Sequence, residues 1–155
     1  MDNRLHIKKI LIAVEDSPYS EKAAAYGFAL ATMVHADVVL LHVNEVQTPV
    51  MNVGDPLLNE PGMIMPELIT AQEESSQKLL DRMAEKYRDE NLQISTFRKL
   101  GNTRDEILNM ADECNADLII LGTHGRTGFD HFITGSVSES VSRHAKCPVL
   151  IVPNK

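Results

Sequence analysis

Glycine and serine residues near the C-terminal end of the chain have the spacing of an anion-binding loop. Gly122-Thr-His-Gly125 directly follows an apolar run at 118–121, and nine residues separate it from Gly135-Ser136-Val137-Ser138. Glycine has no Cβ, so backbone N–H groups beside it can approach an oxyanion closely, and a helix N-terminus stabilises the same charge. Two glycine clusters on either side of a loop therefore indicate a site for nucleotide phosphates.

Two familiar phosphate-binding motifs do not fit this loop. The chain has no Gly-Lys-Ser or Gly-Lys-Thr sequence, which a P-loop requires, and its glycines lack the dinucleotide-binding spacing. His124 and His131 have no carboxylate or cysteine at zinc-site spacing, so a metal held by protein ligands alone is not expected. We expect instead a Mg²⁺ ion carried by the phosphates.

Several candidate residues have a second interpretation. Ser136 and Glu139 form a Ser-x-x-Glu capping box, so Ser136 could cap its helix, although the two glycine clusters favour a phosphate contact. Arg126 is either a surface cation or a phosphate ligand. Asp16 could cap the helix that follows the first strand, but we favour a ligand contact. Glu15 beside it could help to hold a divalent metal or face water.

Composition excludes some classes of partner. The chain has 155 residues, the size of one domain, which we place at 1–155, and its net charge is −7. That charge opposes binding to nucleic acid or to an anionic membrane surface. No apolar signal core and no window of about 20 apolar residues is found, so we expect a soluble, cytoplasmic protein. Cys114 and Cys147 are expected to be reduced structural thiols.

Apolar runs alternate with longer segments of helical period, which is typical of repeated βα units. The predicted fold class is α/β: an open five-stranded parallel sheet with helices on both faces. Strands are expected at 10–14, 38–43, 93–100, 116–121 and 149–152, and helices at 17–34, 67–87, 103–114 and 136–145. The run at 38–43 suits a central strand, whereas 93–100 alternates and suits an edge. His42 is interpreted as a core or rim residue with satisfied hydrogen bonds rather than a ligand.

Local signals predict how the helices begin and pack. Ser17 is expected to cap the first helix, with Pro18 at its first position. Gly27 is expected to allow a close approach to the sheet. The buried stripe of that helix is predicted as Ala23, Gly27, Leu30 and Val34. The inner face of the helix at 67–87 is predicted as Leu68, Ala71, Leu79, Leu80 and Met83. Thr103 and Glu106 are expected to form a capping box.

Strand order decides which loops share the ligand crevice, because open α/β sheets bind ligands where the winding direction reverses. In the order 3-2-1-4-5 the crevice brings Glu15-Asp16-Ser17 beside Gly122–Gly125. In the order 2-1-3-4-5 it opens beside Gly101-Asn102. The richer glycine signal after the fourth strand favours 3-2-1-4-5.

The pattern Gly122-x2-Gly125-x9-Gly135-Ser136, with Asp16 and the final Cys147–Val152 run, resembles the ATP-binding branch of the universal stress protein family over nearly the whole chain. The resemblance implies the 3-2-1-4-5 sheet and adenine nucleotide binding. It places Ala13, Val14 and Asp16 beside the nucleoside and the backbone of Val43 against the adenine. It also implies the ribose and phosphate contacts Gly122, His124, Gly125, Arg126, Gly135, Ser136, Val137 and Ser138.

Three functions are compatible with these residues. A phosphoryl transferase would need a cationic clamp, a positioned metal and a residue that orients the nucleophile, and only parts of that set are visible. We therefore favour a regulatory, stress-response protein that binds ATP. A slow magnesium-dependent ATPase is the enzymatic alternative. A ligand-free dimeric scaffold is the third possibility, if the glycines only shape turns.

The last strand predicts self-association. Val149, Leu150, Ile151 and Val152 are all apolar, and almost no chain follows them to cover the outer edge of the strand. An unpaired strand edge invites pairing with another strand. Two copies that meet antiparallel would satisfy these backbone groups with twofold symmetry, and the family resemblance implies the same homodimer.

Overall fold

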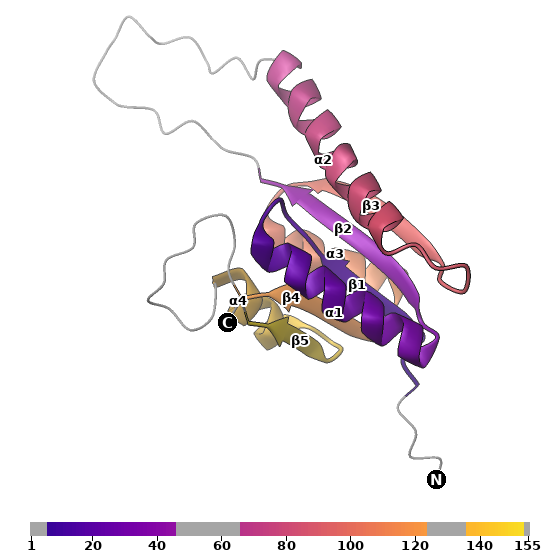
Figure 1. Cartoon of the computed structure of the whole chain (residues 1–155). Coiled ribbons are helices and arrows are strands. Elements are labelled where there is room, and N and C mark those ends of the chain that lie inside the picture. The colour runs from indigo at the N-terminus through magenta and orange to yellow at the C-terminus, as the bar shows by residue number, and fades with distance from the viewer. Residues whose placement is uncertain (1–5, 46–65, 124–135, 154–155) are drawn as a thin grey trace, which may run out of the picture.

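The computed structural model describes residues 6–45, 66–123 and 136–153. These residues form one parallel sheet with helices on both faces (Figure 1). The elements in chain order are β1 (Lys9–Ala13), α1 (Pro18–Val34), β2 (Asp37–Asn44), α2 (Pro66–Lys86), β3 (Ile94–Leu100), α3 (Thr103–Cys114), β4 (Leu118–Gly122), α4 (Ser136–His144) and β5 (Val149–Val152). The strand order is β3-β2-β1-β4-β5, so the predicted 3-2-1-4-5 sheet is confirmed and the alternative order is wrong.

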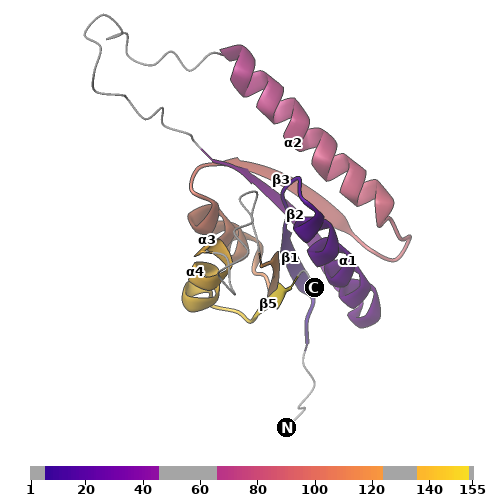
Figure 2. The same cartoon turned by 60° about the vertical axis from the view of Figure 1, so that its left-hand side comes forward.

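The sheet separates two apolar layers. Helices α1 and α2 cover one face, and α3 and α4 cover the other (Figure 2). Successive residues of β1 point to opposite faces, so Ile10 and Ile12 pack in the α1–α2 layer and Leu11 packs in the α3–α4 layer. All three side chains are fully buried. A strand buried on both faces needs an apolar run, which β1 has at 10–13, β2 at 38–41 and β4 at 118–121.

Helix α1 begins as the sequence predicts. Ser17 is the N-cap, its Oγ accepts a hydrogen bond from the backbone N–H of Ser20 at 3.3 Å, and Pro18 is the first helical residue. The predicted buried stripe is wrong at its C-terminal end, because Val34 is 37% exposed there. The inner face lies instead on Ser20, Ala23, Ala24, Gly27, Phe28 and Ala31, with Leu30 at its margin.

Gly27 lies where α1 packs closely against the sheet. A Cβ built at this position lies 2.5 Å from Cδ1 and 2.9 Å from Cγ1 of Ile12, and 3.3 Å from Cδ1 of Ile120. Both isoleucines are fully buried in a core in which side chains are closely packed. The predicted role of Gly27 in a close approach is therefore confirmed.

Helix α2 packs through its C-terminal half only. Leu68 is 69% exposed and Ala71 is also exposed, so the predicted inner face is wrong in the first two turns. Burial begins at Ser76 and continues through Leu79, Leu80 and Met83. The helix extends past the carboxyl ends of β2 and β3 in Figure 1, so its first turns have no strand beneath them.

The N-cap of α3 differs from the prediction by one residue. Asn102, not Thr103, is the cap, and its Oδ1 accepts a hydrogen bond from the N–H of Asp105 at 3.2 Å. Asparagine caps helices as well as serine or threonine does. The Thr103 hydroxyl instead donates to Glu45 Oε1 at 2.7 Å. The predicted Thr103–Glu106 capping box is therefore absent.

Gly27→Ala should destabilise the fold by about 1–2 kcal/mol. Alanine gains about 1 kcal/mol of helix propensity over glycine, but overpacking a filled core costs about 1–3 kcal/mol, and we expect the overpacking to prevail. Urea unfolding measures the difference. Ile12→Val removes the clashing Cδ1 atom, so it should be less harmful in the Gly27→Ala background than alone. Additive effects of the two substitutions would contradict the close approach.

Candidate functional site

The loops that follow β1 and β4 leave the same edge of the sheet. The two strands are parallel neighbours, with Ile12 opposite Ile120, and the order of the sheet reverses between them. The N-termini of α1 and α4 lie at this edge because each helix follows one of these strands. A helix N-terminus carries partial positive charge and free N–H groups. The edge between β1 and β4 is thus suited to an anionic ligand.

The backbone between β1 and α1 is held by hydrogen bonds at each step. The N–H of Val14 donates to the carbonyl of Leu41 at 2.8 Å, and the carbonyl of Val14 contacts Nδ1 of His42 at 2.8 Å. The N–H of Glu15 donates to Ser20 Oγ at 2.9 Å, and its carbonyl accepts from the N–H of Ser17 at 2.9 Å. Ala13 is half-buried and Val14 is buried. The backbone on this side of the site is therefore fixed by contacts within the protein.

Asp16 extends from this loop toward α2. Its Oδ1 lies 3.3 Å from Nη2 of Arg82, and its side chain is 65% exposed. The helix cap is Ser17, so the alternative in which Asp16 caps α1 is wrong. Arg82 also lies 3.6 Å from Glu21, which accepts a 2.7 Å hydrogen bond from Lys86. That bond to Glu21 raises the pKa of the Lys86 ammonium. Exposed ion pairs of this kind are weak, so Asp16 remains accessible to a ligand.

Gly122 ends β4 against the first turn of α1. A Cβ at this position would lie 3.1 Å from the carbonyl oxygen of Tyr19 and 3.3 Å from its carbon. The next residue, Thr123, is buried, and its N–H donates to the carbonyl of Val152 at 3.2 Å. Glycine at position 122 therefore allows the close packing of β4 against the backbone of α1, independently of any ligand.

The structure describes three of the predicted phosphate contacts at the start of α4. Ser136 is exposed, Val137 is half-buried against the α3–α4 core, and Ser138 is 4% exposed. Of these three residues, only Ser136 is exposed. Glu139, the partner of Ser136 in the predicted capping box, accepts a 2.7 Å bond from Arg143. His124, Gly125, Arg126, His131 and Gly135 lie outside the described residues.

The predicted adenine contact, Val43, is half-buried near the end of β2 between two buried polar residues. His42 is 7% exposed, with Nδ1 2.8 Å from the Val14 carbonyl and Nε2 3.0 Å from Asn44 Oδ1. Its interpretation as a satisfied core histidine is confirmed. The sequence analysis missed Asn44 and its partner Ser76, whose Oγ lies 2.9 Å from Asn44 Oδ1. Ser76 has the helical spacing of Leu79, Leu80 and Met83, which was a usable signal.

Comparison with known proteins identifies the family. The family model described as "Universal stress protein family" matches residues 6–153. A universal stress protein of Methanocaldococcus jannaschii, MJ0531, is 34% identical over 145 residues, which cover 94% of this chain and 81% of that protein. The Bacillus subtilis universal stress protein YxiE is 31% identical over 144 residues, which cover 93% and 97%. This chain belongs to the universal stress protein family.

Solved structures of the family agree with the fold. The structure of M. jannaschii MJ0577 has a TM-score of 0.81 and 26% identity, and the match covers 97% of this chain and 98% of that one. A universal stress protein in complex with cAMP has a TM-score of 0.66 with 18% identity and covers 96% and 98% of the two chains. The Archaeoglobus fulgidus universal stress protein in complex with dAMP has a TM-score of 0.61 at the same identity and coverage. At 18% identity, the likeness to the last two shows the fold alone.

The described residues contain neither a membrane-spanning helix nor a metal-binding cluster. No helix among residues 6–45, 66–123 and 136–153 is long and apolar enough to cross a membrane. Within the same residues, no group of three or more histidine, cysteine or acidic side chains could hold a metal ion.

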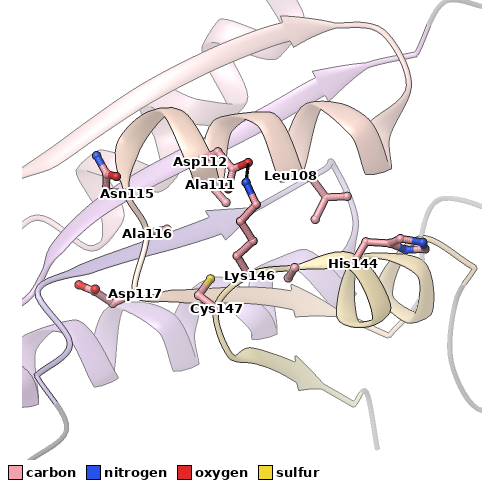
Figure 3. A pocket seen from close by; sticks show the side chains of 10 residues that line it. Leu108, Ala111, Asp112, Asn115, Ala116, Asp117, His144, Lys146 and Cys147 are labelled. Carbon is pink, nitrogen blue, oxygen red and sulfur yellow. Dashed lines mark hydrogen bonds and ion pairs between the residues drawn. The ribbon is translucent and has the colours of Figure 1, made fainter.

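A separate pocket of about 420 Å³ lies at the amino ends of β4 and β5, on the opposite edge of the sheet (Figure 3). Lys146 extends across it to Asp112, with Nζ 2.7 Å from Oδ2, and Cys147 lines its wall. None of the predicted phosphate or nucleoside contacts lines this pocket. It is therefore distinct from the candidate site of this universal stress protein.

Cys147 and Cys114 are free thiols, and both are half-buried. Burial raises the pKa of each thiol above the ordinary 9.0. The unfolded chain ionises its thiols first as the pH rises. The two thiols therefore stabilise the fold below the ordinary pKa, and this contribution is lost as the pH rises through the folded-state values.

Alkylation of the folded protein should accordingly be slow at neutral pH, because the thiolate is the reactive form. Iodoacetamide rates measured from about pH 7.5 to pH 10 should give midpoints above 9.0 for both thiols. A Cys147→Ser variant isolates Cys114. The same chain in concentrated urea is the control and should react with an ordinary midpoint. A folded-state midpoint at or below the ordinary value would contradict the effect of burial.

Proposed function

We propose that this universal stress protein binds ATP at the edge between β1 and β4 and acts as a nucleotide-responsive regulatory protein. The main support is the fixed backbone at 14–17, which lies at the strand-order reversal beside the start of the glycine loop. Two family members of known structure are in complex with adenine nucleotides, one with cAMP and one with dAMP. The Gly122-x2-Gly125-x9-Gly135-Ser136 pattern favours a ligand with several phosphates.

The residues around the site divide between the two halves of the nucleotide. Ala13, Val14, Asp16 and the backbone of Val43 serve the nucleoside in this proposal. The glycine loop and the amides at 136–138 serve the phosphates. Ser138 is buried and Val137 has no polar side chain, so these two residues would donate through their backbone N–H groups. Mg²⁺ would arrive with the phosphates, which supply the oxygen ligands that it prefers.

Asp16 gives the proposal a specific test. Removal of a charged hydrogen-bond acceptor from the ligand contact should weaken ATP binding by about tenfold. Isothermal titration of Asp16→Ala with ATP and Mg²⁺ measures the change. Asp81→Ala removes an exposed carboxylate from α2 and is the matched control, which should bind ATP like the wild-type chain.

Experiments on the wild-type protein test whether it binds an adenine nucleotide at all. Heat denaturation followed by mass analysis should release an adenine nucleotide, or titration should show ATP binding. A nucleotide-free protein that also fails to bind ATP would leave the ligand-free scaffold as the function. Single-turnover assays with and without Mg²⁺ separate binding from hydrolysis, and rapid magnesium-dependent turnover would favour the ATPase.

We also propose that two copies pair through β5. This strand is at the edge of the sheet, and Leu150 is 38% exposed on it. Leu150 lies opposite Ile120, which packs in the layer covered by α1. The exposed side chain is therefore on the α1 side of the edge.

The flank of α1 beside this edge is also apolar. Phe28 stacks on Tyr87 with ring centroids 4.7 Å apart, on the side of α1 that faces the end of α2. The helical period places Tyr26 and Met33 on the other flank, toward β5, and they are 57% and 77% exposed. Antiparallel pairing of two β5 strands would bring these flanks toward each other and bury apolar surface as well as the free strand edge.

Leu150→Glu should convert the dimer to a monomer, because a carboxylate would have to be buried in the interface. Light scattering at micromolar concentration should give twice the 17.2 kDa chain mass for the wild type and the chain mass for the variant. Leu68→Glu changes an exposed leucine of α2 in the same way and should leave the dimer intact. A wild-type monomer would contradict the pairing.

A further inference from the structure

A buried chain of hydrogen bonds connects the candidate nucleoside site with α2. It begins at the carbonyl of Val14, 2.8 Å from His42 Nδ1, and continues from His42 Nε2 to Asn44 at 3.0 Å. Asn44 then contacts Ser76 Oγ at 2.9 Å. His42, Asn44 and Ser76 are 7%, 8% and 4% exposed, so water cannot readily replace these contacts.

The protons in this chain can be assigned from the acceptors. The Val14 carbonyl only accepts, so His42 carries a proton on Nδ1. Ser76 has one hydroxyl proton, and the carbonyl of Gln72 is its nearer acceptor at 2.7 Å. With the Asn44 amide turned so that its NH₂ group faces both neighbours, it donates to His42 Nε2 and to Ser76 Oγ. The contacts among Val14, His42, Asn44 and Ser76 then each pair one donor with one acceptor, with a neutral imidazole.

The buried hydrogen-bond chain lies next to the proposed nucleoside site. His42 and Asn44 are on either side of Val43, the proposed adenine contact, and His42 holds the carbonyl of Val14, which is a proposed nucleoside neighbour. The carbonyl of Asn44 also accepts a 2.9 Å bond from the N–H of Gly101 at the end of β3. The ends of three adjacent strands are therefore fixed by the same few residues.

We propose that His42, Asn44 and Ser76 are positioning residues for the nucleoside half of the nucleotide. They fix the backbone at Val14 and Val43, and they do so from beneath the site without touching the ligand. The inference rests on the proposed ATP binding. It adds that Ser76, on a helix that contributes no proposed nucleotide contact, controls the affinity for adenosine.

Ser76→Ala against Ser75→Ala is the sharpest comparison. The two serines are adjacent on α2, but Ser76 is buried and belongs to the hydrogen-bond chain, whereas Ser75 is exposed. Ser76→Ala should weaken the binding of ATP and of adenosine by about fivefold to tenfold, the effect of one lost buried hydrogen bond. Binding of inorganic tripolyphosphate should be unchanged, because the hydrogen bonds that connect Val14, His42, Asn44 and Ser76 do not extend to α4. Ser75→Ala should bind all three ligands like the wild type.

His42→Phe is the second variant, since it keeps a ring in the core and removes both hydrogen bonds. It should show a larger loss for adenosine than Ser76→Ala, again without a change for tripolyphosphate. Circular dichroism and melting curves confirm that each variant is folded at the titration temperature. Equal losses for adenosine and tripolyphosphate, or no loss in either variant, would overturn the positioning role. Failure of the wild type to bind ATP would instead overturn the proposed function.

Discussion

The parallel pairing of β1 with β4 is the constraint on which the rest of the molecule depends. Each strand is buried on both faces, so a shift of one residue in register would move apolar side chains from one layer to the other. The register therefore fixes where β1 ends relative to β4. It also fixes where the following segments begin, because Val14 is hydrogen-bonded directly after β1 and Gly122, the last residue of β4, is packed against α1.

Much of this arrangement could be predicted from the sequence because it depends on local or periodic signals. The central strands contain apolar runs, Ser17-Pro18 is a strong helix-start signal, and the glycines at and after the end of β4 favoured the observed strand order. The α3 cap was wrong by one residue because Asn102 and Thr103 are both good caps. Residue type alone does not indicate which of two adjacent capping residues is the N-cap.

The remaining errors concern contacts between distant residues. Leu68 and Ala71 have the helical spacing of a buried face, but no strand lies beneath the first turns of α2, and periodicity cannot show where a sheet ends. The Asn44–Ser76 contact joins residues that are 32 positions apart. Each residue alone is an ordinary polar side chain in the sequence. The predicted contacts at 124–126 and Gly135 rest on the motif, because they lie outside the described residues.

The nucleoside side of the candidate site is held by hydrogen bonds within the protein itself. The nucleoside side has fixed backbone at Val14 and Glu15 and a buried hydrogen-bond chain beneath it. A ligand that meets such a surface loses little affinity to ordering the protein. Asp16 is the exception, since its partner Arg82 is on α2 and their ion pair is exposed. A ribose hydroxyl or a cation that binds Asp16 would replace only the weak ion pair between Asp16 and Arg82. Helix α2 would then lose one of its links to the β1–α1 loop. The proposed binding at the sheet edge would thereby be coupled to α2, the helix whose first turns extend into solvent.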